Sequence, residues 1–200
     1  EKLALRSQYG LEPDRFVVMG VGQLQTRKGV MDFVRIARDL PQITFVWAGG
    51  FSFGGMTDGY REIKQVVDNP PDNVKFLGIV DREAMNGLYN VADLMFLPSY
   101  AELFPMAILE AMSAGTPILL RNLDIYEDIL FDFYLKADTI PGFEKIIRRL
   151  ANDPAYYAEA VAMAGRGNTF YGRDHVAHMW RDFYDGVMMN TATAQRERAY

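Results

Sequence analysis

The sequence predicts an α/β fold in which a Rossmann-like parallel sheet is flanked by helices. Two observations support this fold class: five short segments are predominantly apolar, without a regular alternation with polar residues, and amphipathic helical segments separate them. A strand without a polar face is buried on both sides, which is typical of a parallel sheet covered by helices. Right-handed crossovers then place every strand-to-helix turn on one edge of the sheet, where such folds bind ligands.

The strands are expected where apolar runs end at glycine or proline. Their expected ranges are 16–22, 43–48, 74–77, 94–97 and 117–120, with a sixth near 133–135. The first three runs end at glycines and the fourth ends at Pro98. Because these ends share one edge of the sheet, we expect the glycine turns and the loop after residue 97 to converge on one crevice.

The helices are expected where apolar residues recur at spacings of three and four. Their expected ranges are a stretch before Gly10, then 29–40, 58–67, 81–92, 105–114, 124–133 and 143 onward, with breaks near residue 154 and over 165–172. Pro105 suits the first position of its helix, and Gly115 suits the end. Residues 1–190 are therefore expected to form one domain, whereas residues 191–200 lack apolar periodicity and are expected to form an irregular tail.

The composition excludes several classes of protein. The chain has 21 basic and 26 acidic residues, a formal net charge of −5, so nucleic acid is not an expected partner. The lack of cysteine excludes disulfides, thiolate metal sites and a cysteine nucleophile, and it allows a cytoplasmic location. No apolar run approaches the roughly 20 residues needed to cross a bilayer.

The turn after the first expected strand begins like a nucleotide-binding loop. It starts Gly20-Val21-Gly22, but Gln25 stands where the third glycine of the dinucleotide fingerprint is required. Arg27 and Lys28 follow at the start of a helix, where the helix dipole disfavours cations unless an anion is bound. A diphosphate is the obvious anion, and the alternative is a solvated basic turn.

Two acidic residues mark the region after the fourth expected strand. Glu102 lies in the loop, and Glu110 lies inside the following helix among apolar residues, so Glu110 is expected to have a polar partner. Their separation of about 10 Å along the helix is wide for two groups that share one reacting bond. Carboxylates accept hydrogen bonds from vicinal hydroxyls, so a sugar and a ribose are natural ligands. The alternative is a helix cap and one salt-bridged glutamate.

Two features near the C-terminus have ordinary explanations. His175 and His178 could face a metal together, but no third ligand stands nearby in the sequence, so no metal site is expected. An apolar stripe in the last helix is expected either to pack in the core or to form an interface with another domain. The stripe consists of Met179, Trp180, Phe183, Tyr184, Val187 and Met188.

Several of these segments together resemble glycosyltransferase family 4, the retaining enzymes of the two-domain GT-B fold. The matching segments are Gly22-x-Leu24, Lys28-Gly29, Val74 to Gly78, Ala92-Asp93, Leu97 to Ser99 and the Glu102-x7-Glu110 block. The resemblance covers the C-terminal, donor-binding half of such an enzyme and implies that the acceptor-binding N-terminal half is absent. Four further segments, 47–54, 57–60, 104–110 and 124–130, are similar to Gram-positive synthases that add a second hexose to monoglucosyl-diacylglycerol.

The resemblance implies roles for individual residues. Lys28 would bind the donor diphosphate, Glu102 the sugar hydroxyls and Glu110 the ribose hydroxyls, with Glu102 and Lys28 as the catalytic residues. The full donor-binding set is Gly22, Gln23, Arg27, Lys28, Gly78, Ile79, Glu102, Leu103, Phe104, Pro105, Met106 and Glu110. Two positions depart from the family pattern: Gln23 replaces the usual arginine, and Pro105 replaces the usual glycine and lacks an N–H.

The resemblance also implies an activity. A hexose would pass from UDP-glucose or UDP-galactose to a glycolipid with retention of configuration, by front-face displacement and without a metal or other cofactor. The full-length protein would lie peripherally on the inner face of the membrane, and the donor domain by itself would bind UDP weakly and transfer nothing. Two alternatives are a nucleotide-sugar epimerase of the same fold, which would make sugar isomers without an acceptor, and a non-catalytic nucleotide-binding module.

Overall fold

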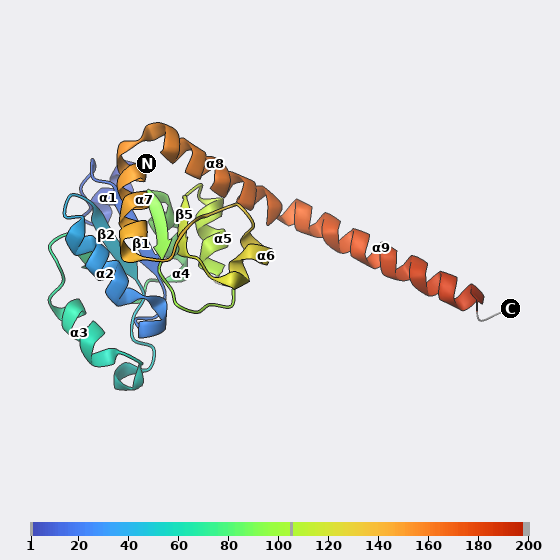
Figure 1. Ribbon diagram of the computed structural model, residues 1–200, viewed down its shortest axis with the longest axis horizontal. Helices are drawn as coiled ribbons and strands as arrows, with labels where there is room; N and C mark the ends of the chain where they lie inside the picture. The colour runs from blue at the N-terminus through green and yellow to red at the C-terminus, as the bar shows by residue number, and fades with distance from the viewer. Residues whose placement is uncertain (1, 105, 198–200) are drawn as a thin grey trace.

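The protein forms a six-stranded parallel sheet in the computed structural model (Figure 1), which describes residues 2–104 and 106–197, with side chains up to residue 188. The strands are β1 (Val17–Val21), β2 (Thr44–Ala48), β3 (Val74–Phe76), β4 (Leu94–Leu97), β5 (Ile118–Arg121) and β6 (Leu135–Ala137). Their order in the sheet is β3-β2-β1-β4-β5-β6, and each neighbouring pair is parallel. The predicted α/β class with a parallel sheet is confirmed.

Helices cover both faces of the sheet. They are α1 (Lys2–Gln8), α2 (Val30–Asp39), α3 (Tyr60–Asp68), α4 (Arg82–Val91), α5 (Met106–Ser113), α6 (Glu127–Leu130), α7 (Ile140–Asn152), α8 (Pro154–Phe170) and α9 (Arg173–Glu197). Three 3₁₀ turns join them: η1 (Thr26–Lys28), η2 (Gly54–Met56) and η3 (Asp124–Tyr126). One face packs against α4, α5 and α6, the other against α2, α3 and α7, and α8 contributes to both.

The core divides into two clusters because side chains alternate along each strand. Val17 and Met19 of β1 enter the cluster on the α4–α5 face, and Val18 between them enters the opposite cluster. On the α2 face, the Phe33 ring lies edge-on to Trp47 with ring centroids 5.0 Å apart. Both faces of the central strands β1, β2, β4 and β5 are therefore buried, which is why these strands are almost entirely apolar.

The strand order places one crevice at the centre of the sheet. β1 pairs with β2 on one side and β4 on the other, with Val18 opposite Leu94. The chain therefore leaves β1 and β4 toward opposite sides, which opens a crevice beyond their carboxyl ends. The loops after β1 and β4 carry Lys28 and Glu102, so the two predicted catalytic residues belong to this crevice.

The structure corrects two expectations about the second half of the chain. The predicted helix over 124–133 is the short turn η3 followed by one turn of α6, and it ends at Phe131, whose φ of 51° is left-handed. Gly165 lies inside the continuous helix α8, so the break is confined to Tyr171 and Gly172. Pro105 lies outside the described residues.

The C-terminal helix α9 continues past the point where an irregular tail was expected. It runs to Glu197, so residues 191–197 are helical and only residues 198–200 lie outside the description. Figure 1 shows α9 projecting away from the sheet and its helices. Within the described ranges, no helix is long and apolar enough to cross a membrane.

Candidate functional site

The glycine turns after β1, β2 and β3 meet at the carboxyl edge, as predicted. The Gly22 N–H donates to the Ala48 carbonyl at 2.9 Å, and the Gly49 N–H donates to the Gly78 carbonyl at 2.7 Å. Gly22 and Gly49 have φ values of 135° and 139°, and a Cβ on Gly49 would lie 1.9 Å from the Gly22 carbonyl oxygen. Only glycine allows these two backbones to approach so closely.

An ion pair between Lys28 and Glu102 occupies the crevice. Lys28 Nζ lies 2.6 Å from Glu102 Oε1, and the side chains are 13% and 6% exposed. Arg27 Nη1 lies 3.3 Å from Glu102 Oε2 and also donates to the Ala101 carbonyl. The stem of Lys28 lies alongside Gly22, because a Cβ there would lie 3.2 Å from Lys28 Cε. The Glu102 carboxylate thus pairs with both Arg27 and Lys28, the two cations of the predicted diphosphate site.

The ion pair borders a hollow that suits a charged, hydroxylated ligand. The hollow measures about 520 Å³ and is lined by Arg27, Lys28 and residues 101–104. Its two cations can neutralise phosphate oxygens, and its carboxylate can accept hydrogen bonds from hydroxyls. Chemically, the arrangement can bind a ligand that carries phosphate and sugar groups side by side.

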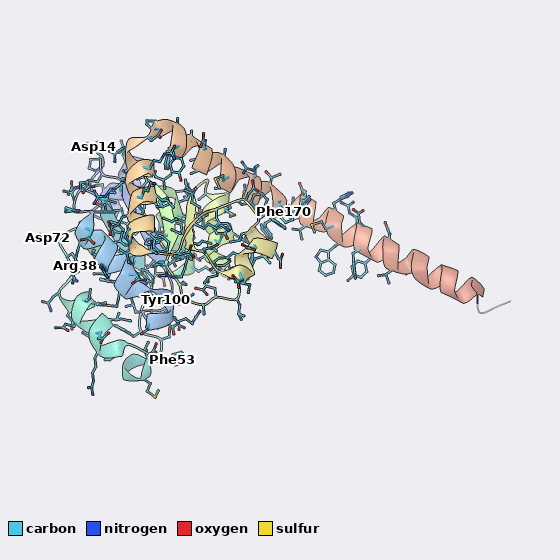
Figure 2. All side chains as sticks on the ribbon, in the orientation of Figure 1. Asp14, Arg38, Phe53, Asp72, Tyr100 and Phe170 are labelled. Carbon is cyan, nitrogen blue, oxygen red and sulfur yellow. The ribbon has the colours of Figure 1, made fainter. Side chains whose placement is uncertain are left out.

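A second cluster holds the Glu102 loop against α2. Arg121 Nη2 lies 2.5 Å from Asp32 Oδ2, and the same oxygen accepts a hydrogen bond from the Tyr100 hydroxyl at 2.7 Å. The Arg121 guanidinium lies 4.1 Å from the Tyr100 ring centroid, and Figure 2 shows Tyr100 beside the start of α2. The Tyr100 N–H donates to the Arg27 carbonyl at 2.8 Å. This cluster fixes the loop two residues before Glu102.

Sequence reasoning missed this cluster, although one signal was present. Arg121 directly follows three apolar residues of β5, and a charge at the carboxyl end of a buried strand needs a partner. Tyr126 was also missed as a neighbour of Glu102. Burial raises the pKa of Tyr126 well above its ordinary value, and the Glu102 carboxylate adds to the rise. No signal in the sequence placed Tyr126 near Glu102.

Glu110 lies in a different hollow, and its environment differs from the expectation. Its side chain is on the exposed face of α5 rather than buried against the sheet. The expected polar partner exists: the Tyr89 hydroxyl donates to Glu110 Oε2 at 2.7 Å. This hollow of about 210 Å³ is lined by Arg82, Met85, Asn86, Tyr89, Glu110 and Ser113. The two predicted acids therefore line two different cavities.

Of the remaining predicted donor residues, Leu103 and Phe104 line the Lys28–Glu102 hollow. Ile79, Leu103 and Met106 are exposed, at 79%, 83% and 61%. Phe104 packs on Tyr171 with ring centroids 5.8 Å apart. Gln23 accepts a hydrogen bond from Gln25 at 3.2 Å. Among the described residues, neither Gln23 nor Met106 forms a hydrogen bond or ion pair with Lys28 or Glu102.

The two histidines and the apolar stripe predicted near the C-terminus all lie on α9. Among the described residues, no three His, Cys, Asp or Glu side chains are grouped so as to hold a metal ion. His178 lies 3.4 Å from Asp182 on the same helix. The apolar stripe of α9 is exposed, with Trp180 at 56% and Phe183 at 59%, so it does not pack in the core of this domain.

Comparison with known proteins gives the family. The family described as glycosyl transferases group 1 matches residues 1–166. The chain is 48% identical over 185 residues to an alpha-galactosylglucosyldiacylglycerol synthase of Streptococcus pneumoniae, covering 92% of this chain and 50% of that protein. It is 36% identical over 152 residues to a processive diacylglycerol alpha-glucosyltransferase of Acholeplasma laidlawii, covering 75% and 45%. The chain thus spans about half the length of these curated relatives.

Solved structures support the fold. The crystal structure of Anabaena HepE in complex with UDP and glucose superposes with a TM-score of 0.75 at 23% identity, covering 94% of this chain and 51% of that one. A sucrose-phosphate synthase from Thermosynechococcus elongatus superposes with a TM-score of 0.74 at 24% identity, covering 93% and 49%. The sheet and its helices are those of a GT-B glycosyltransferase domain. The chain belongs to the glycosyl transferases group 1 family.

Proposed function

We propose that this chain is the donor-binding part of a hexosyltransferase that builds a membrane glycolipid. The observation that carries the proposal is the Lys28–Glu102 pair at the central crevice, with Arg27 on the same carboxylate. The cations suit the diphosphate of an activated sugar, and the carboxylate suits the hexose hydroxyls. Because the relatives are about twice as long, the acceptor would be bound by residues outside this chain.

The proposed donor is UDP-glucose or UDP-galactose. The Glu110 hollow, which residues of α4 and α5 line, would receive the nucleoside, and its carboxylate suits the ribose hydroxyls. The turn at Gly78 would approach the uracil with its backbone. The structure of HepE, which superposes on this chain, holds UDP and glucose, and this supports a uridine donor as the first ligand to test.

The proposed reaction proceeds with retention and by front-face displacement. The bond between the anomeric carbon and the diphosphate oxygen breaks, and the acceptor hydroxyl forms the new bond on the same face. The proton of that hydroxyl passes to the departing diphosphate oxygen. Lys28 and Arg27 would stabilise the negative charge that grows on this oxygen, which is the kind of electrostatic effect that contributes most to catalysis. We propose that this chemistry needs no metal ion, so EDTA should leave transfer unchanged.

The proposed acceptor is a diacylglycerol glycolipid such as monoglucosyl-diacylglycerol. The support is the identity to two relatives whose names specify diacylglycerol-based products or acceptors. An acceptor of this kind lies in a membrane, so the complete enzyme would work at the cytoplasmic membrane surface.

The experiment is a calorimetric titration of the chain with UDP, UDP-glucose, UDP-galactose and GDP-mannose. We expect the uridine ligands to bind and GDP-mannose to bind at least about tenfold more weakly. Lys28→Met should weaken UDP binding about tenfold, because a charge-assisted hydrogen bond is lost. Lys145→Met, on the exposed side of α7, is the matched control and should change nothing. Equal binding of UDP by wild type and Lys28→Met would refute the proposed site.

A further inference from the structure

Tyr89 of α4 places a phenolic hydroxyl at the boundary between the core and the Glu110 hollow. The residue is 2% exposed and belongs to the core cluster between α4 and α5. Its backbone is tied to the loop between α5 and β5, because the Thr116 hydroxyl donates to the Tyr89 carbonyl at 2.8 Å in a buried position. The ring therefore has a fixed position, and its hydroxyl reaches Glu110 Oε2 at 2.7 Å.

This contact fixes an otherwise exposed carboxylate. Glu110 projects from α5 toward solvent, and a glutamate there would normally sample several rotamers. The buried phenol restricts the Glu110 side chain to conformations in which Oε2 faces α4. A carboxylate has about four acceptor positions, so one hydrogen bond leaves most of them for a ligand. Burial raises the pKa of Tyr89, and the hydrogen bond to Glu110 adds to the rise, so the phenol stays protonated and donates.

The hollow beside this pair contains further polar groups. Arg82 and Asn86 come from α4, and Ser113 comes from α5, where its hydroxyl donates to the Glu110 carbonyl at 2.8 Å. The Glu110 carboxylate thus borders the cavity at a point where both the backbone and the side chain are anchored. Such an arrangement can distinguish ligands by the number of hydroxyls they offer.

We propose that Tyr89 is a positioning residue for Glu110, and that the pair selects ribonucleotides over 2′-deoxyribonucleotides. This inference rests on the proposed function, because it takes the Glu110 hollow as the ribose end of the donor site. A fixed carboxylate accepts from both vicinal hydroxyls of a ribose. A 2′-deoxyribose leaves one acceptor without a partner, and sites built to bind a hydroxyl reject analogues that lack it.

The test compares the affinities of UDP and 2′-deoxy-UDP for wild type, Tyr89→Phe and Tyr134→Phe. We expect wild type to prefer UDP by about tenfold or more. Tyr89→Phe should reduce this preference to about threefold or less and leave 2′-deoxy-UDP binding unchanged within about twofold. Tyr134→Phe is the matched control: its buried hydroxyl makes no hydrogen bond within the described part of the chain, so it should keep the wild-type preference.

Each other outcome contradicts either the inference about Tyr89 or the proposed function. If Tyr89→Phe weakens both nucleotides equally or changes neither, Tyr89 only packs in the core and the inference is wrong. Equal binding of both nucleotides by wild type also overturns the inference but leaves the proposed function standing. If wild type binds neither nucleotide, the proposed function itself fails. Glu110→Gln provides a second variant should Tyr89→Phe not fold, and it too should lose the preference for UDP.

Discussion

The Lys28–Glu102 pair predicts that removing the charge of a site residue, Glu102, strengthens the binding of UDP. In the structure, Glu102 holds Lys28 at 2.6 Å and Arg27 at 3.3 Å, and its side chain is only 6% exposed. A diphosphate that engages these cations competes with the carboxylate for them. Glu102→Gln keeps the shape of the side chain and removes its charge. We therefore expect this variant to bind UDP more tightly than wild type does.

The magnitude follows from the hydrogen bonds at the site. A hydrogen bond to a charged group contributes about 1.5–3 kcal/mol, and one between neutral groups about 0.5–1.5 kcal/mol. An amide would retain part of the interaction with Lys28, so about 1 kcal/mol becomes available to the diphosphate. Arg27 adds little, because its side chain is 43% exposed and solvent screens its charge. The expected gain in UDP affinity is about fivefold.

Isothermal titration with UDP and UDP-glucose measures the effect. Glu102→Gln should bind UDP more tightly, yet it should lose affinity for UDP-glucose relative to UDP, because Glu102 is proposed to hold the hexose. Glu12→Gln makes the same charge change in an exposed ion pair with Arg15, at the amino end of the sheet. It should leave both affinities unchanged. A tenfold loss of UDP affinity in Glu102→Gln would show that the carboxylate assists the diphosphate, and the competition argument would be refuted.

Three further predictions concern stability. Gly49→Ala should lower the free energy of unfolding by about 3 kcal/mol or more, because its Cβ would lie 1.9 Å from the Gly22 carbonyl oxygen. Its melting temperature should fall by about 6–12 °C. Gly165→Ala, at an exposed position inside α8 with open space around it, should raise the free energy of unfolding by about 0.5–1 kcal/mol. The Tyr156 N–H lowers the pKa of the Asp153 carboxyl, so this group stabilises the fold above about pH 4 and the effect is lost as the pH falls through the lowered value. The free energy of unfolding, measured with urea, should therefore fall less steeply between about pH 5 and pH 2 for Asp153→Asn than for wild type. An equal slope for both proteins would contradict the role of this cap.

The local pattern of the sequence was enough to predict most elements of the fold. Apolar strands that end at glycines, such as the one before Gly22, predict a buried parallel sheet, because a strand in such a sheet has no solvent face. The errors occurred where periodicity was followed without regard to packing. Residues 124–133 carry a helical pattern, but the chain turns at Phe131 to bring β6 beside β5. Gly165 suggested a break, yet α8 runs through it without interruption from Pro154 to Phe170.

The sequence by itself determined which residue types stand at the carboxyl edge: glycine turns, two adjacent cations and two acids eight positions apart. Only the tertiary structure decided which of them touch. The order of the strands sets β1 beside β4, and this brings Lys28 to Glu102 across 74 positions of chain. The packing of α4 on α5 brings the Tyr89 hydroxyl to the Glu110 carboxylate. Such pairings depend on distances between separate elements, and no local propensity along the chain encodes them.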